Sequence, residues 1–130
     1  MNRAAALGAY VTANWERPFA YSDWDCAQFA AGWVEVLTGE NPAAQFRGRY
    51  GDTGGGLALL RSRGFDSPLA YAKAQYGRVP TGAAQVGDLA VVNTPGGPAF
   101  GVVQGYRIYV VGEAGMMTMD LSAARLVFRV

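Results

Sequence analysis

The sequence contains no histidine, and its only cysteine is Cys26. A single cysteine cannot form an intramolecular disulfide, which is consistent with folding in a reducing cytoplasm. The same counts exclude zinc sites built from histidines or from several cysteines. We therefore expect a chain that binds no metal ion and no other cofactor.

Charge is also sparse and balanced. Eleven Lys and Arg residues stand against ten Asp and Glu residues, so the formal net charge is +1, and no basic surface for nucleic acid is indicated. No apolar run approaches the roughly 20 residues that a membrane-spanning helix needs. Residues 1–7 lack the long apolar core of a secretory signal peptide. We therefore expect neither nucleic acid binding nor a membrane span.

What the sequence does contain is typical of a packed globular protein, because 51% of the residues are apolar and 12% are aromatic. The length of 130 residues suits one domain, residues 1–130. A chain of this size can bury about two-thirds of its unfolded surface, so it needs no disulfide or metal to fold.

The first half of the chain has helical patterns. Apolar residues recur at helical spacing, Ser and Asp residues precede them as caps, and Gly or Pro residues end them. The predicted helices cover Arg3–Asn14, Cys26–Leu37, Leu57–Arg63 and Pro68 to about Tyr76, with a further turn of helix at Pro42–Phe46.

The second half has strand patterns. Short segments rich in β-branched residues are separated by Gly or Pro turns, and residues 104–107 join two of them as a hairpin. Helices followed by such strands predict an α+β fold, in which N-terminal helices pack on a C-terminal antiparallel sheet of about five strands. The predicted strands are Leu89–Val92, Gly101–Gln104, Arg107–Val111, Met116–Met119 and Leu126–Val130.

Two motifs suggest chemistry but have simpler explanations. The glycine run at residues 51–56 invites comparison with a phosphate-binding loop, yet it lacks the Gly-Lys-Ser/Thr ending and a preceding strand, so a turn into a helix is favoured. Asp23 and Asp25 could form an acid/base pair for sugar hydrolysis. Capping of the following helix explains both aspartates with fewer assumptions.

Cys26 is the candidate nucleophile because of its position. It lies in the first turn of a predicted helix, next to Asp25 and between Trp24 and Phe29. Backbone N–H groups and the helix dipole at such a position lower a cysteine pKa and favour the thiolate. The alternative is a small buried residue that fills the interface between helix and sheet.

Two segments carry a resemblance to a known family. Residues 25–30, Asp-Cys-Ala-Gln-Phe-Ala, and residues 85–92, Gln-Val-Gly-Asp-Leu-Ala-Val-Val, are together similar to the NlpC/P60 superfamily of papain-like cell-wall amidases and endopeptidases. More narrowly, residues 15–130 resemble a small related family encoded near phage tail genes and in gene transfer agents. The resemblance implies an NlpC/P60 (papain-like) fold with Cys26 at the nucleophile position.

The sequence departs from this family at the general base. NlpC/P60 catalysis needs a histidine at the head of the second strand, and that position falls at about Ala99 or Phe100. The residue that orients the base falls near Tyr109 or Val110. Neither alanine nor phenylalanine can accept a proton from a thiol. The family's catalytic roles therefore transfer only as far as Cys26, as a vestigial or active nucleophile.

The resemblance then implies a function without catalysis. The hypothesis is a structural component of a phage or gene-transfer-agent tail tip, made in the bacterial cytoplasm and located in the virion, with neighbouring tail-tip or hub proteins as partners. The first alternative is an active cysteine peptidase or amidase that cleaves peptidoglycan during DNA delivery, with a base from elsewhere. The second is a pseudoenzyme that binds a small peptide or a glycan.

Candidate partner contacts lie in two loops rich in arginine and aromatic residues, residue types that are enriched at protein interfaces. Arg17 belongs to the segment from Trp15 to Trp24, and Arg47 and Arg49 belong to the segment 46–50. The aromatic residues of the first segment have an alternative role in the domain's own core. The arginines are harder to bury, because an unpaired buried charge is costly. We expect at least one of the three arginines to contact a neighbouring chain.

Overall fold

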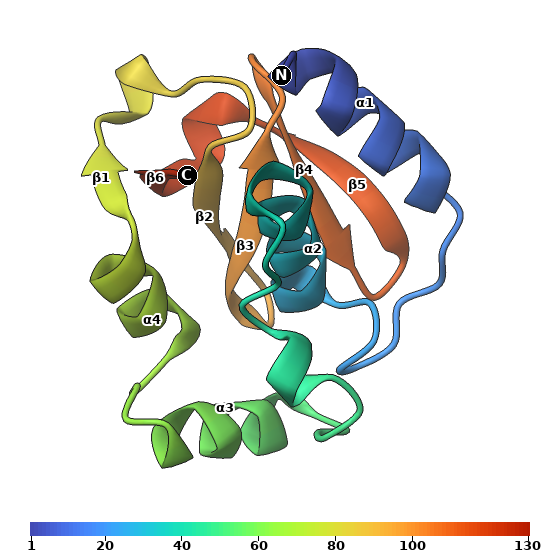
Figure 1. The fold of residues 1–130 in the computed structure, drawn as a ribbon, viewed down its shortest axis with the longest axis vertical. Coiled ribbons are helices and arrows are strands. Elements are labelled where there is room, and N and C mark those ends of the chain that lie inside the picture. Colours follow the sequence, from blue (N-terminus) through green and yellow to red (C-terminus); the bar gives the residue numbers. More distant parts are fainter.

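Four α-helices precede all six strands of the sheet along the chain, as Figure 1 shows. The computed structural model describes residues 1–130. The helices are α1 (Arg3–Asn14), α2 (Cys26–Thr38), α3 (Thr53–Ser62) and α4 (Pro68–Gln75). The strands are β1 (Gly77–Val79), β2 (Leu89–Thr94), β3 (Gly97–Val103), β4 (Arg107–Gly112), β5 (Gly115–Asp120) and β6 (Ala124–Arg129). The predicted α+β class is therefore confirmed.

The helices begin at side-chain caps. Asp25 caps α2 by accepting a hydrogen bond from the backbone N–H of Gln28, and Gly39 ends that helix in the left-handed conformation at φ 86°. The start predicted for α3, Leu57, is wrong, because the helix begins four residues earlier, at Thr53, after the capping carboxylate of Asp52, and residues 54–56 lie in its first turn. No helix combines the length and the apolar character needed to cross a bilayer.

The strands form one antiparallel sheet in the order β1-β6-β2-β3-β4-β5. The prediction of about five strands missed β1, which is only three residues long and pairs with β6 through Val79 and Val127. It also started β3 at Gly101, whereas pairing of Thr94 with Gly97 extends the β2–β3 hairpin to its turn. Short strands and turn-side residues carry too little alternation to be recognised from sequence.

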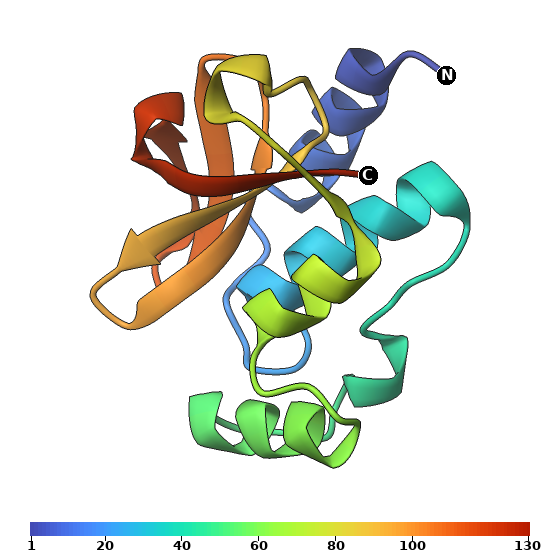
Figure 2. The ribbon, with the colours of Figure 1, turned by 90° about the vertical axis from the view of Figure 1, so that its left-hand side faces the viewer.

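The helices lie on one side of the sheet, as Figure 2 shows. Alternate residues of β2 and β3, such as Val91 and Val102, face these helices and join Phe29 and Trp33 of α2 in the main core. The residues between them face the other way and form a second, fully buried cluster that includes Val92 and Val103. Both faces of the central strands are therefore buried, which fixes the direction of each side chain.

Asp88 ties three elements together at the entrance to β2. Its fully buried carboxylate receives two hydrogen bonds from Arg129 of β6, at 3.0 and 3.1 Å, and one from the backbone N–H of Gln85 at 2.8 Å. The indole N–H of Trp33 in α2 donates to the carbonyl of Gly87 at 2.8 Å. The Gly-Asp turn therefore sets the position of α2 relative to the sheet, and with it the position of Cys26.

Candidate functional site at Cys26

Cys26 is the first residue of α2, and its thiol lies against β3, where the backbone N–H of Phe100 donates to the sulfur. The sequence predicted a cysteine in the first turn of the central helix, facing a strand that starts near Phe100. The structure confirms the helix position and the facing strand, but that strand, β3, already starts at Gly97.

The electrostatic expectation for Cys26 is wrong. Burial raises the pKa of the Cys26 thiol, and the nearby charge of Asp25 raises it further. Backbone hydrogen bonds from Phe100 and from the first turn of the helix lower the pKa, but burial outweighs them. The neutral thiol is therefore favoured over the thiolate. The sequence shows the helix N-terminus, but it does not show that the folded chain covers the half-buried Cys26 side chain.

The strand opposite Cys26 offers no base. Phe100 packs with the core on the helix side of the sheet, whereas Ala99 belongs to the cluster on the opposite face. The same alternation places Tyr109 on the helix side and Val110 on the opposite face. Of the two positions considered for the base, Phe100 is the one that faces the thiol, and it carries no titratable group.

The neighbouring carboxylate of Asp25 is fully engaged. It accepts hydrogen bonds from the backbone N–H groups of Ser22 at 3.0 Å and Gln28 at 2.8 Å, and from the hydroxyl of Tyr50 at 2.5 Å. Asp23, in contrast, points to Arg17, with 3.0 Å between the charged groups. The predicted capping is therefore confirmed for Asp25, which caps α2. It is wrong for Asp23, which pairs with Arg17 instead, and the two carboxylates serve different partners rather than forming an acid/base pair.

Two residues of this site were missed by the sequence analysis. Tyr50 lies beside Asp25, and burial together with that hydrogen bond raises the pKa of its phenol well above the usual range. Gln28 is fully buried, donates to the carbonyl of Ala43 at 3.3 Å and accepts from Arg47 at 3.4 Å. Both come together only through the fold of residues 41–50, for which the sequence has no periodic pattern.

Ser22 shapes the turn before the site. It is the only residue other than glycine with a positive φ, 62°, and its hydroxyl accepts a hydrogen bond from the N–H of Gly48 at 3.1 Å. The loop that carries Arg47 and Tyr50 is thereby held against the start of α2. The polar groups around Cys26 thus bind one another and hold the loop in place.

The glycine run does not form a phosphate site. The N-terminus of α3 is occupied by the carboxylate of Asp52, which accepts from the N–H of Gly55 at 2.7 Å. A negative charge at that position opposes the binding of an anion.

The three arginines proposed as contacts differ. Arg17 pairs with Asp23 and stacks over Trp24 at 4.3 Å from the ring centroid. The guanidinium of Arg47 donates to Gln28, and the side chain of Arg49 is exposed and forms no hydrogen bond or ion pair. Internal contacts therefore account for the first arginine and part of the second.

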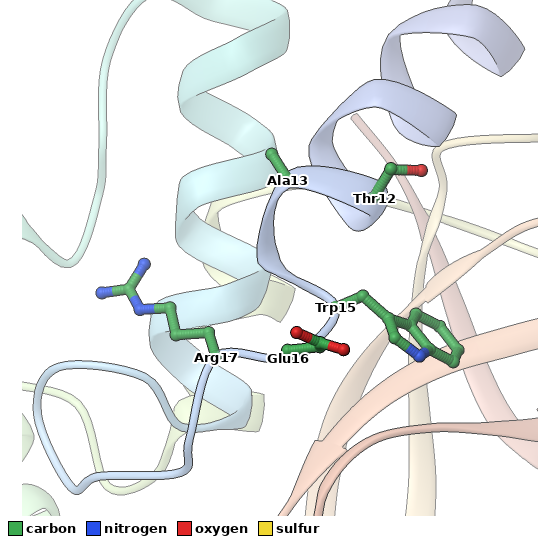
Figure 3. A pocket seen from close by; sticks show the side chains of 5 residues that line it. All are labelled: Thr12, Ala13, Trp15, Glu16 and Arg17. Carbon is green, nitrogen blue, oxygen red and sulfur yellow. The ribbon is translucent and has the colours of Figure 1, made fainter.

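Two surface depressions lie around Trp15, away from Cys26. One has a volume of about 570 Å³ and is shown in Figure 3. The other, of about 510 Å³, extends to the β4–β5 turn. Neither is lined by Cys26; the residues common to both are Trp15, Glu16 and Arg17.

Fold and site together define an α+β protein whose single cysteine opens the central helix against an antiparallel sheet. The whole chain, residues 1–130, matches a family model described as "Domain of unknown function (DUF6950)". The chain therefore belongs to this family. A search of curated proteins found no match.

Proposed function

We propose that this chain is a structural component of a phage or gene-transfer-agent tail tip, built on a degenerate NlpC/P60 peptidase scaffold with a papain-like fold and without catalytic activity. The observation that carries the loss of activity is Phe100, which stands opposite Cys26 where the family's histidine is expected. The assignment to a tail tip rests on the resemblance of residues 15–130 to tail-associated proteins.

Acyl transfer by a cysteine needs a base that takes the thiol proton and an acid that protonates the leaving amine. Phenylalanine can do neither. Asp25 does not replace it, because its oxygens already accept three hydrogen bonds. The raised pKa of Cys26 disfavours the remaining route, a thiolate formed without a base.

The alternative is an active cysteine peptidase or amidase that cleaves peptidoglycan, with Cys26 as the nucleophile. Its support is the position of Cys26 at the N-terminus of α2 and the backbone hydrogen bond from Phe100. It requires a base from a neighbouring chain.

Digestion of purified peptidoglycan separates the two proposals. The isolated chain is expected to release no stem peptides, and C26S is expected to change nothing. Particles that contain the chain provide the second arm, because they would supply a base in trans. Cleavage by particles that C26S abolishes would establish the peptidase and overturn the structural role.

The proposed location of the chain at the tail tip is tested separately. Antibody labelling of purified particles, read by electron microscopy, is expected to mark the tail tip. Label along the capsid, or its absence from particles that carry every other tail protein, would contradict the proposed location.

A further inference from the structure

An exposed aromatic side chain, Trp15, lies at the two surface depressions, next to exposed charged side chains. Trp15 follows the last turn of α1, and 48% of it is exposed, although most aromatic side chains of the fold are buried or half-buried. Its ring meets Tyr109 of β4 edge to face, with 6.5 Å between the centroids. This contact fixes the indole on the sheet and leaves the rest of its surface to the two depressions.

The free charges beside Trp15 are negative. Glu16 lines both depressions, and Glu113 lines the second one from the β4–β5 turn. Both are exposed, and neither takes part in an ion pair or a hydrogen bond. Two carboxylates without a partner therefore border one exposed indole.

The cation in this segment is turned away. Arg17 lines the depressions, but its guanidinium bonds to Asp23 and Asn14 and lies over Trp24. Figure 3 shows the side chains of Arg17 and Trp15 extending in opposite directions, with Glu16 between them. The charge of Arg17 is thus paired with Asp23 within the chain, and the unpaired charges at the two depressions are those of Glu16 and Glu113.

We propose that this surface, formed by Trp15, Glu16 and Glu113, binds an arginine side chain presented by a partner protein. A guanidinium group stacks on an indole by a cation–π interaction and donates paired hydrogen bonds to carboxylates. Both depressions are lined by Trp15 and provide room for such a side chain beside the ring. This site is independent of the activity or inactivity of Cys26 and of a location in a tail.

The sequence analysis expected positively charged side chains to contact a partner, whereas the proposed site is negatively charged. It expected at least one of Arg17, Arg47 and Arg49 to contact a neighbour. In the structure Arg17 pairs with Asp23, whereas Glu16 and Glu113, which line the depressions, are exposed. The partner's contribution is therefore expected to be basic.

Titration with two matched peptides tests the site. The probes are acetyl-Gly-Gly-Arg-Gly-Gly-amide and the same peptide with citrulline, which has the shape of arginine without its charge. Amide and indole N–H signals of the labelled full chain are followed by NMR. The arginine peptide is expected to shift the indole signal of Trp15 and the amides of Glu16 and Glu113, and to bind at least fivefold more tightly than the citrulline peptide.

Variants locate the effect. W15A is expected to abolish the shifts, E113Q to weaken binding two- to fivefold, and E113K to weaken it further while leaving the fold unchanged, because Glu113 is exposed in a turn. E40Q and Y106A, exposed changes elsewhere, serve as controls and should bind like the original chain. Equal affinity for both peptides, shifts that map away from Trp15, or no binding at millimolar peptide would overturn the proposal.

Discussion

Asp25 and Asp88 are both buried aspartates in the two segments that suggested a peptidase, but the fold treats them differently. Asp88 is bound by the guanidinium of Arg129, and Arg3 lies 4.0 Å away. Asp25 is bound by two backbone N–H groups and the phenol of Tyr50, with no cation in contact. Asp88 therefore joins distant parts of the chain, whereas Asp25 organises the turn and loop around one helix start.

This comparison shows what the two motifs do in this chain. Neither carboxylate is free to act on a substrate, because each has its oxygens filled by donors from the protein. Both aspartates hold parts of the fold together, a role that does not require catalysis. Substitutions can separate the long-range role of Asp88 from the local role of Asp25.

The largest effect is expected at Asp88. D88A leaves Arg129 and the N–H of Gln85 without their acceptor and should lower the free energy of unfolding by about 3 kcal/mol, the low end for a buried pair because Arg129 is partly exposed. Urea denaturation measures it. D66A, a change at an exposed aspartate without contacts, is the control. A loss for D88A no larger than that of D66A would contradict the long-range role.

D25A should cost less, about 2 kcal/mol, because it removes a helix cap and the acceptor of Tyr50 but breaks no contact between charges. The matched control is D52A, which removes the exposed cap of α3 and should cost about 1 kcal/mol. If D25A costs more than D88A, the ranking of the two aspartates is wrong.

Y50F tests the local role of Asp25 more narrowly, because it removes only the hydroxyl that donates to Asp25. It should cost about 1 to 2 kcal/mol at neutral pH, and it should change the alkaline behaviour. Because the folded pKa of Tyr50 is raised, the stability tied to its protonated form is intact below the unfolded pKa of about 10 and is lost as pH rises beyond it.

Denaturation between neutral pH and about pH 11 should therefore show a smaller decline for Y50F than for the original chain. Y106F, at a tyrosine that is 89% exposed, should leave the decline unchanged. Identical slopes for Y50F and the original chain would show that Tyr50 is not protected by its burial.

The smallest effect is expected at Arg47. Its side chain is exposed and its bond to Gln28 is long, at 3.4 Å. R47A should therefore change stability by about 0.5 kcal/mol or less. A loss as large as that of Y50F would mean that the loop depends on Arg47 rather than on the contact between Tyr50 and Asp25.

The sequence predicted the parts of this molecule that depend on local rules. The cap at Asp25 and the glycine at position 39 mark the limits of α2, and alternation marks the central strands. The position of Cys26 against β3 followed from the family resemblance. Local patterns thus defined the frame that carries the site.

The remaining parts depend on contacts between distant residues. Tyr50 meets Asp25 across 25 positions, and no spacing rule indicates such a pair. The depth of burial that raises the pKa of Cys26 comes from packing against β3. Arg17 looked like a free charge because its partner Asp23 is recognised only once the loop is folded.

The most direct test of the account is the rate at which iodoacetamide alkylates Cys26 as a function of pH, with the urea-unfolded chain as reference. A half-buried thiol with a raised pKa and no base should react more slowly than the unfolded chain at neutral pH, and its rate should keep rising with pH and level off only above the ordinary thiol pKa of about 8.5. A rate that already reaches its plateau below pH 7 would mean an activated thiolate at Cys26, and it would contradict the claim that this site has lost its catalytic chemistry.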